Sequence, residues 1–323
     1  MKRFLVALVV AFITLVAVNL AMGKETKYPN KPITFIIPYG TGGMTDLTAR
    51  MITEQMKPLV GQPMIIVNKP GASGMIGLKE LLRAKPDGYT LAFTTVMPFP
   101  APYFKKMEPF DMEAFKYVGS YMPQERVVLA QNDAPYKTWP QFIEYVRKNP
   151  GKVTFGAGGA NWTIEVMKSV AIKEGGLKMR YVLFKSGGDA ASAILGGHVD
   201  LVETGVGTAA YQAARAGKLR ILVGLGAGSI PNFPDVPNLA DLGYPFLASN
   251  EYGILLPGGV SESIRQYWED QLRRVMEDPV FLRKMLDIGF VPRFLPGREW
   301  KRKCITLTSS VPELLKYNKT LKE

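Results

Sequence analysis

Short apolar segments alternate with helical patterns along most of this chain, and this alternation constrains the fold more than any other feature. The first cycle runs from the apolar segment 33–37 through a glycine-rich turn to a helical pattern over about 45–59. Two further apolar segments, 64–67 and 91–94, follow with a helix between them. Because strands separated by helices form mostly parallel sheets covered on both faces, the pattern predicts an α/β fold.

The alternation restarts near Val127, which predicts a second sheet. Its expected strands are 127–130, 153–155, 181–184, 201–203 and 219–225. A proline-rich loop then leads to one more apolar run, 253–256, and to helical patterns over 262–277, 280–286 and 298–316. The restart and the return predict two lobes, with residues 28–125 and 249–323 in one and residues 126–248 in the other.

Composition excludes several classes of protein. The chain has 323 residues, of which 47% are hydrophobic and 21% charged, so it has enough apolar surface to form well-developed cores. With one cysteine, Cys304, it cannot form an internal disulfide, and with one histidine, His198, it cannot build the Cys/His cluster of a structural zinc site. Calcium or magnesium held by carboxylates stays open.

Residues 1–23 have the pattern of an export signal. Lys2 and Arg3 precede an apolar run over 4–18, and small residues stand at Ala21 and Gly23. The alternative is a membrane anchor, but 15 residues are fewer than the ~20 that a spanning helix needs. We therefore expect cleavage after Gly23 and a soluble protein of the periplasm, without lipid attachment because no cysteine follows the apolar run.

The charge distribution argues against nucleic acid or a membrane surface as partner. The formal net charge of +12 becomes +10 when the two positive charges of the signal are removed. Lysines and arginines are scattered, and the densest run, 301–303, is short and lacks interleaved aromatic residues. A basic protein of this kind favours small acidic ligands through electrostatic steering.

Glycine and hydroxyl residues follow several of the predicted strands. They stand at 40–43, 72–74, 156–163 and 186–188, and Thr94-Thr95 ends a further strand. Because ligands of open α/β sheets bind beyond the carboxyl ends of the strands, these loops are expected to converge on one cleft. The spacing fits neither the dinucleotide motif nor the Walker motif, so no cofactor is expected. A glycine-rich turn that only reverses the chain is the alternative.

These segments, taken in order, resemble one known family. The first motifs are Tyr28-Pro29-x-Lys31-Pro32-Ile33, Pro38-x-x-x-Gly42-Gly43-x-x-Asp46-x-x-Ala49-Arg50 and Asn68-x-Pro70-Gly71-Ala72-x-Gly74-x-x-Gly77. The later ones are Pro86-Asp87-Gly88-Tyr89-Thr90-Leu91, Gly187-Gly188-Asp189-Ala190, Leu195-Gly196-Gly197-His198-Val199-Asp200 and Asp235-Val236-Pro237-x-Leu239 with Gly243-Tyr244-Pro245. Together they are similar to the extracytoplasmic solute receptors of tripartite tricarboxylate transporters, the TctC or Bug family, over essentially the whole mature chain.

The resemblance implies a two-lobed periplasmic binding protein fold of type II-like architecture, with the ligand cleft between the lobes. It also implies a di-, tri- or aromatic carboxylate as ligand and a membrane permease of a large and a small subunit as partner. We expect a monomer. Asp46, which follows the first glycine loop, and Thr94 and Thr95, which follow a strand, are added to the residues that the resemblance implies. The candidate ligand-binding residues are Tyr39, Gly40, Thr41, Gly42, Gly43, Asp46, Ala72, Ser73, Gly74, Thr94, Thr95, Gly158, Gly159, Ala160, Asn161, Trp162, Lys185, Ser186, Gly187, Gly188 and Asp189.

Three of these side chains have structural alternatives. Asp46 is suited to capping the helix after the first glycine loop, because a bare carboxylate would repel an anionic ligand. Lys185 either pairs with a distal carboxylate or is solvated. Trp162 is expected to wall the cleft, with packing inside the lobe as the alternative. Because glycine and hydroxyl residues outnumber cations in these loops, we expect the backbone amides of Gly42, Gly43 and Gly74 to be the main donors.

The functional alternatives differ in whether a chemical step follows binding. An exported hydrolase would need an activated nucleophile, but the sequence lacks G-x-S-x-G and any serine triad would have to use His198. This histidine stands in a helix-to-strand connection, where a surface or structural role is the expectation. A protein that presents its ligand to a membrane sensor kinase would use the same cleft as a transport receptor. The sequence does not separate those two.

Overall fold

The computed structural model describes residues 28–320 except 106, 159–160, 185–186 and 289, so the predicted signal at 1–23 lies outside the described residues. Its elements, in chain order, are β1 (Ile33–Ile37), α2 (Met44–Val60), β2 (Met64–Asn68), η1 (Ala72–Gly74), α3 (Met75–Arg83), β3 (Thr90–Thr95), α4 (Ala101–Lys105), η2 (Met112–Ala114), β4 (Phe115–Gln131), α5 (Trp139–Lys148), β5 (Thr154–Gly158), α6 (Asn161–Lys173), β6 (Arg180–Phe184), α7 (Gly187–Leu195), β7 (Leu201–Gly205), α8 (Ala209–Arg215), β8 (Leu219–Gly224), β9 (Ser249–Pro257), α9 (Glu262–Glu277), α10 (Pro279–Asp287), β10 (Leu295–Pro296), α11 (Gly297–Ser309) and α12 (Val311–Lys319).

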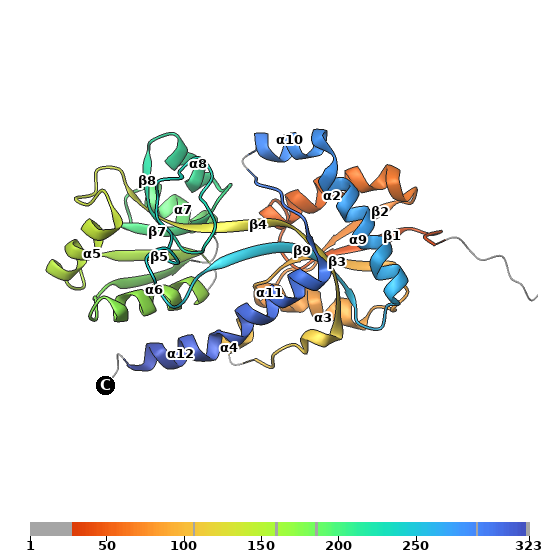
Figure 1. Cartoon of the computed structure of the whole chain (residues 1–323), viewed down its shortest axis with the longest axis horizontal. Coiled ribbons are helices and arrows are strands. Elements are labelled where there is room, and N and C mark those ends of the chain that lie inside the picture. The colour runs from red at the N-terminus through yellow and green to blue at the C-terminus, as the bar shows by residue number, and fades with distance from the viewer. Residues whose placement is uncertain (1–27, 106, 159–160, 185–186, 289, 321–323) are drawn as a thin grey trace, which may run out of the picture.

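The strands form one hydrogen-bonded path in the order β2-β1-β3-β9-β4-β7-β5-β6, and β8 and β10 both pair with β4. Strands β1, β2 and β3 are parallel, as are β5, β6 and β7, whereas β4 and β9 run antiparallel to their neighbours. Figure 1 shows two bodies joined by β4 and β9. We call the body built on β1–β3 the first lobe and the body built on β5–β7 the second lobe. The predicted two-lobed α/β fold is confirmed.

Strand β4 belongs to both lobes. It is 17 residues long, and its first part pairs with β9 while its last part pairs with β7 and β8. The sequence predicted this strand only over 127–130. The structure differs because β4 begins at Phe115 and links the two sheets into one path.

The first lobe has a core on each face of its sheet, as the period-2 alternation of strand side chains requires. Ile33, Phe35 and Ile37 of β1 pack on one face, in a cluster that also contains side chains of α2 and α9. Ile36 points to the other face and packs in a cluster with side chains of α3 and α11. All four side chains are at most 3% exposed. Each such burial stabilises the fold by roughly 1.5–3 kcal/mol.

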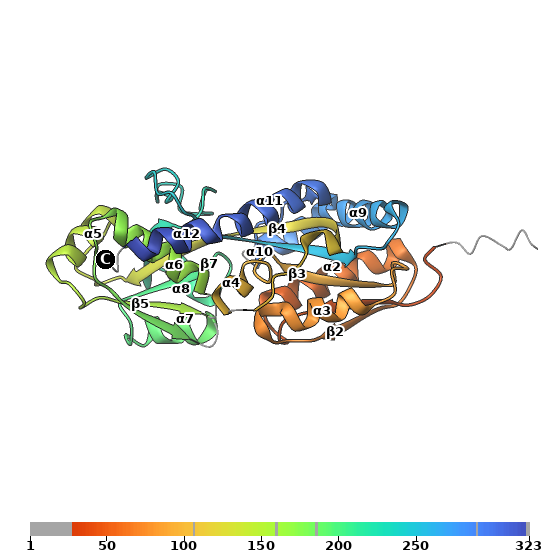
Figure 2. The same ribbon diagram turned by 90° about the horizontal axis from the view of Figure 1, so that it is seen from below.

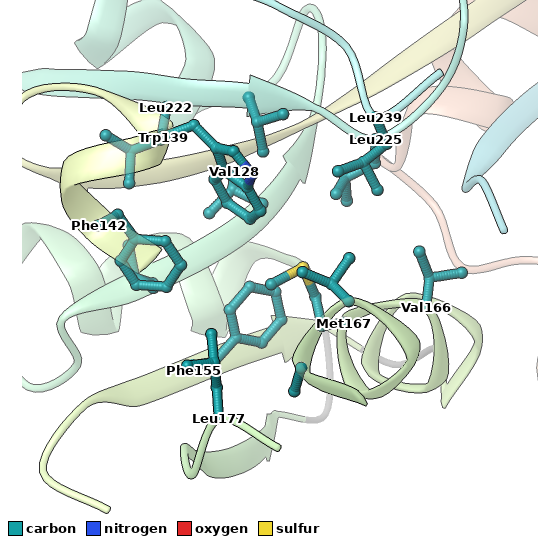
Figure 3. Close-up of a cluster of buried hydrophobic side chains, with 14 of the residues drawn as sticks. Val128, Trp139, Phe142, Phe155, Val166, Met167, Leu177, Leu222, Leu225 and Leu239 are labelled. Carbon is teal, nitrogen blue, oxygen red and sulfur yellow. The ribbon is translucent and has the colours of Figure 1, made fainter. Parts of the chain in front are cut away.

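The second lobe repeats this arrangement with α5 and α6 on one face and α7 and α8 on the other. Figure 3 shows Trp139, Phe142, Phe155 and Met167 gathered in one apolar space between the strands and the helices. Helix α5 begins at Thr138, whose side chain accepts a hydrogen bond from the amide of Gln141 as an N-cap. The second lobe therefore has a core of its own.

The C-terminal helix α12 departs from the predicted division of the chain. The sequence placed all of 249–323 with the first lobe, but Val311 and Leu314 of α12 are fully buried in the core of the second lobe. The side-chain amide of Asn318 donates to both the backbone oxygen and the carboxylate of Glu165 on α6, at 2.9 and 2.7 Å. Figure 2 shows α11 and α12 as a rod that crosses from one lobe to the other. The remaining boundaries, near 125 and 249, stay a prediction.

Within the described part of the chain, none of the helices combines the length and the apolar character that crossing a bilayer requires.

Candidate functional site

The carboxyl ends of strands from both lobes meet at a short stretch of β4. In the first lobe, β3 ends at Thr95, which is in register with Tyr252 of β9, and Tyr252 is in register with Met122 of β4. In the second lobe, β7 ends at Gly205, which is in register with Arg126 of β4. The loops that follow the strands of the two lobes therefore face each other across Met122–Arg126, the position at which open α/β sheets bind ligands.

Helix α2 begins at this edge with an N-cap residue that provides no side-chain cap for the first backbone donors. Its N-cap, Gly43, has an extended backbone and no side-chain oxygen, and residues 40–43 are exposed. The amides of a first helical turn have no acceptor within the helix, and they carry the positive end of its dipole. The start of α2, at Gly43, Met44 and Thr45, is therefore suited to an anion.

Asp46 holds the first glycine loop in place. Its carboxylate accepts a hydrogen bond from the amide of Gly42 at 3.0 Å, two from the Arg50 guanidinium at 3.0 and 2.9 Å, and one from the Asn68 amide at 3.0 Å. Burial alone would raise the pKa of Asp46, but these donors outweigh it and lower the pKa to about 2. The structure therefore favours a structural role for Asp46 over direct contact with the ligand.

Two of the three expected amide donors are already engaged within the protein. The amide of Gly42 donates to Asp46, and the amide of Gly74 donates to the carbonyl of Gly71 at 3.0 Å. The left-handed backbone conformation that favours glycine is found at Gly42 (φ 75°) and Gly74 (φ 95°), whereas Gly43 has φ −74°. The donors at the start of α2 therefore replace Gly42 and Gly74 as candidates.

The second loop of the first lobe packs against Tyr39. A β-carbon added at Gly74 would lie 3.1 Å from the Tyr39 hydroxyl and 2.9 Å from Pro98, so the backbone approaches these side chains closely. The Tyr39 hydroxyl is hydrogen-bonded to Thr95 Oγ1 at 2.8 Å, and burial raises the pKa of Tyr39 to about 12. This contact joins the loops after β1, β2 and β3 into one surface.

The remaining candidates in the first lobe differ in character. Ala72 and Ser73 have left-handed backbones, at φ 47° and 57°, which cost non-glycine residues energy and occur mainly at functional sites. Thr94 is fully buried within β3 and donates to the carbonyl of Thr95 at 3.3 Å. Gly40 and Thr41 are exposed beside the start of α2.

In the second lobe, the candidate loops follow β5 and β6. Gly158 is the last residue of β5, and α6 begins at Asn161. Helix α7 begins with the exposed residues 187–189. Gly159, Ala160, Lys185 and Ser186, which the sequence also nominated, lie outside the described residues. The helix starts of this lobe thus stand at the same edge of the sheet as the end of β7.

Trp162 packs inside the second lobe. It is 2% exposed and belongs to the core that contains Val166 and Met167. Its ring lies edge to face with Phe104 of α4, with the ring centroids 6.1 Å apart. This arrangement favours the packing alternative over the expected role as a wall of the cleft.

The stretch of β4 that lies between the two sets of loops, which we call the floor, is polar, and its residues were not among the candidates expected from the sequence. Gln124 is 4% exposed, and its side-chain oxygen accepts from Asn250 Nδ2 at 3.3 Å and from the Tyr252 hydroxyl at 3.1 Å. Arg126 forms two hydrogen bonds with the fully buried carboxylate of Glu203, at 2.7 and 2.6 Å. A usable signal existed, because the polar run 124–126 interrupts an otherwise apolar segment.

A cavity of about 140 Å³ lies beside this floor. Its wall combines residues of β4, of the segment that precedes β10, and of two loops of the second lobe: Met122, Pro123, Gln124, Glu125, Val206, Gly228, Ser229, Pro231, Phe290, Val291 and Arg293. Burial raises the pKa of the Glu125 carboxyl in this wall. The described candidates from the sequence do not line this cavity. Gln124 belongs to both the floor and the cavity wall, and its amide donates to the carbonyl of Val206, which also lines the cavity.

His198 and possible metal-binding side chains are the remaining groups that a catalytic site could use. His198 is exposed between α7 and β7, near the amino end of β7 and therefore at the opposite edge from the strand ends described above. This position agrees with the surface role expected for it. Among the described residues, no group of three or more His, Cys, Asp or Glu side chains is placed to hold a metal ion.

Comparison with known proteins identifies the relatives of the chain. Residues 48–302 match the family described as "Tripartite tricarboxylate transporter family receptor". A curated relative from Cupriavidus necator, "UPF0065 protein in gbd 5'region", is 30% identical over 87% of this chain and 85% of its own length.

Solved structures show the same architecture. One, titled "Structure of a periplasmic transporter", is 30% identical with a TM-score of 0.76 and is matched over 90% of this chain and 97% of its own. Another, the MatC protein of Rhodopseudomonas palustris with bound malate, is 25% identical with a TM-score of 0.68, over 92% of this chain and all of its own.

Proposed function

Because this chain belongs to the tripartite tricarboxylate transporter family of receptors, we propose that it is a periplasmic receptor that captures an organic carboxylate between its lobes and delivers it to a two-subunit membrane permease. The observation that carries this proposal is the start of α2. Its uncapped amides open beside β4, where the strand ends of both lobes meet. The malate bound to MatC supports a carboxylate as the ligand class.

Binding by this site requires no chemical step. The first-turn amides of α2 provide fixed donors for a carboxylate, and the helix dipole favours its negative charge. Asp46 does not oppose the anion with a free charge, because Arg50 pairs with it at 2.9 Å. Closure of the two lobes then excludes water from the ligand, as in other hinged binding proteins.

The test is a binding screen on the mature protein. Binding of acetate, malate, citrate and benzoate is compared by thermal shift and calorimetry. The mass of the recovered ligand is then measured by mass spectrometry. We expect at least one carboxylate to raise the melting temperature and to be recovered unchanged. A chemically altered ligand would favour the hydrolase alternative, and absence of binding to all four would contradict the proposal.

A matched pair of variants tests the position of the anion. Gly43 has the extended backbone of an N-cap, and a β-carbon there would make only an ordinary contact, 3.5 Å from the Gly40 carbonyl. Gly43→Asp and Gly43→Ser both supply a capping oxygen, but only the first adds a negative charge. We expect Gly43→Asp to bind the carboxylate at least about tenfold more weakly than Gly43→Ser, with equal stability. Equal affinities would place the anion elsewhere.

A further inference from the structure

The side-chain amide of Gln124 is held in one orientation. Its oxygen accepts from Asn250 Nδ2 and from the Tyr252 hydroxyl, both on β9. Because an amide oxygen accepts and an amide nitrogen donates, these two donors fix the oxygen toward β9. The nitrogen of Gln124 must then face away from β9, toward the loops of both lobes.

The two acceptors that the nitrogen meets are unequal. One is the backbone carbonyl of Val206, just after β7 in the second lobe, at 3.2 Å. The other is the thioether sulfur of Met44, the first residue of α2 in the first lobe, at 2.8 Å. A thioether is a weak acceptor, so a buried N–H donor that points at it gains little compared with a carboxylate oxygen.

The surrounding backbone leaves room for this amide. A β-carbon at Gly205 would lie 2.3 Å from Gln124 Nε2, so the glycine at the end of β7 allows the side chain to occupy its position. The nearby guanidinium of Arg126 is already paired with Glu203. Gln124 is therefore a pre-oriented donor between the uncapped start of α2 and the end of β7.

We propose that Gln124 is a ligand-binding and specificity-determining residue, whose N–H leaves the sulfur of Met44 and donates to an oxygen of the bound carboxylate. This inference rests on the proposed function and deepens it. Gln124 lies on the strand that joins the lobes, and it contacts Met44 of the first lobe and Val206 of the second. A carboxylate held by α2 and by Gln124 would therefore be in contact with the closing edge of the second lobe.

The first test is Gln124→Glu, which keeps the shape of the side chain and removes the donors. At pH 8 we expect the carboxylate that binds tightest in the screen to bind this variant at least about tenfold more weakly than the wild type. Burial raises the pKa of a carboxyl in this environment, as it does for the neighbouring Glu125, so the glutamic acid gains a proton as the pH falls toward 5 and can donate it; the ratio of variant to wild-type Kd should then fall toward one. Because the ligand has the same ionisation state in both measurements at a given pH, the ratio of the two Kd values removes the effect of ligand ionisation.

The charged and titratable groups near position 124 are Tyr252 on β9, Tyr39 after β1, Arg126 on β4 with its partner Glu203 on β7, and Glu125 and Arg293, which line the cavity beside Gln124. The two tyrosines stay protonated over this pH range because burial raises the pKa of each. The ion pair between Arg126 and the buried carboxylate of Glu203 is common to variant and wild type. Glu125, whose pKa burial also raises, is present in both proteins, so the substituted carboxyl is the titratable group that only the variant contains.

The second test is Met44→Leu, which is expected to increase the affinity for the carboxylate, whereas Gln124→Glu decreases it. Leucine conserves volume but accepts no hydrogen bond, so the unliganded protein loses the contact that the ligand must displace. We expect this variant to bind the carboxylate about two- to tenfold more tightly. Weaker binding by Met44→Leu, or wild-type affinity of Gln124→Glu at pH 8, would overturn the inference. If the wild type binds none of the carboxylates, the proposed function itself fails.

Discussion

Replacing Asp46 by asparagine tests whether this carboxylate holds the first glycine loop. Its pKa falls from 3.8 to about 2 in the folded protein, and each pKa unit corresponds to about 1.4 kcal/mol, so the charged form contributes about 2.5 kcal/mol. The side chain of Arg50 is 49% exposed, so solvent screens part of this interaction. We therefore expect Asp46→Asn to lower the free energy of unfolding by about 2 kcal/mol at pH 7.

The stabilisation by Asp46 should depend on pH in a defined direction. Because folding lowers the pKa of Asp46, its stabilisation is present above about pH 4 and is lost as the pH falls toward 2. Urea unfolding followed by circular dichroism at pH 7, 5 and 3 measures the difference in unfolding free energy between wild type and variant. This difference should become smaller as the pH falls from 5 to 3. Asp87→Asn is the matched control, because Asp87 pairs with Lys31 at an exposed site and should cost less than half as much. Equal costs for both variants, or a difference independent of pH, would refute the reasoning.

Three further substitutions or reactions test other parts of the structure. Arg126→Met leaves the buried carboxylate of Glu203 unpaired and should cost about 3–5 kcal/mol in urea unfolding, whereas adding Glu203→Leu should recover most of that loss. Gly74→Ala should cost about 1–2 kcal/mol, because the left-handed backbone disfavours a β-carbon and Pro98 lies 2.9 Å from its position. Burial raises the pKa of Cys304, so a thiol reagent should modify it only after unfolding; rapid reaction of the native protein would contradict this.

The local elements could be predicted well because their signals are local. The apolar run 33–37 coincides with β1, and the helix expected over about 45–59 lies within α2. Strand β4 was predicted only in its last part, and Pro123, Gln124 and Glu125 precede that part as an interruption of the apolar pattern. In the structure, pairing with β9 on one side keeps these residues extended, and their polar side chains lie where the two lobes meet. Tertiary pairing overrides the local pattern at this point.

The candidate site was predicted by position but not in its hydrogen bonding. Placing the glycine loops at the carboxyl ends of strands follows from the order of strands and helices alone. Which amides are available depends on side chains that are distant in space, and Asp46 already engages Gly42. The Gln124 network joins residues up to 128 positions apart, from β4 to β9, so sequence spacing contained no information on it.

Helix α12 shows how a pattern can identify a buried face without identifying what covers it. Val311 and Leu314 are three residues apart and share a face, which is consistent with either lobe as the partner. In the structure, Trp300 and Cys304 of α11 are buried in the first lobe, whereas the next helix, after Ser310, is buried in the second. Moving α12 away from the second lobe would expose two fully buried side chains, at about 3–6 kcal/mol. We therefore expect lobe closure to carry α12 with the second lobe and to bend the rod at Ser310, which makes this junction part of the hinge together with β4 and β9.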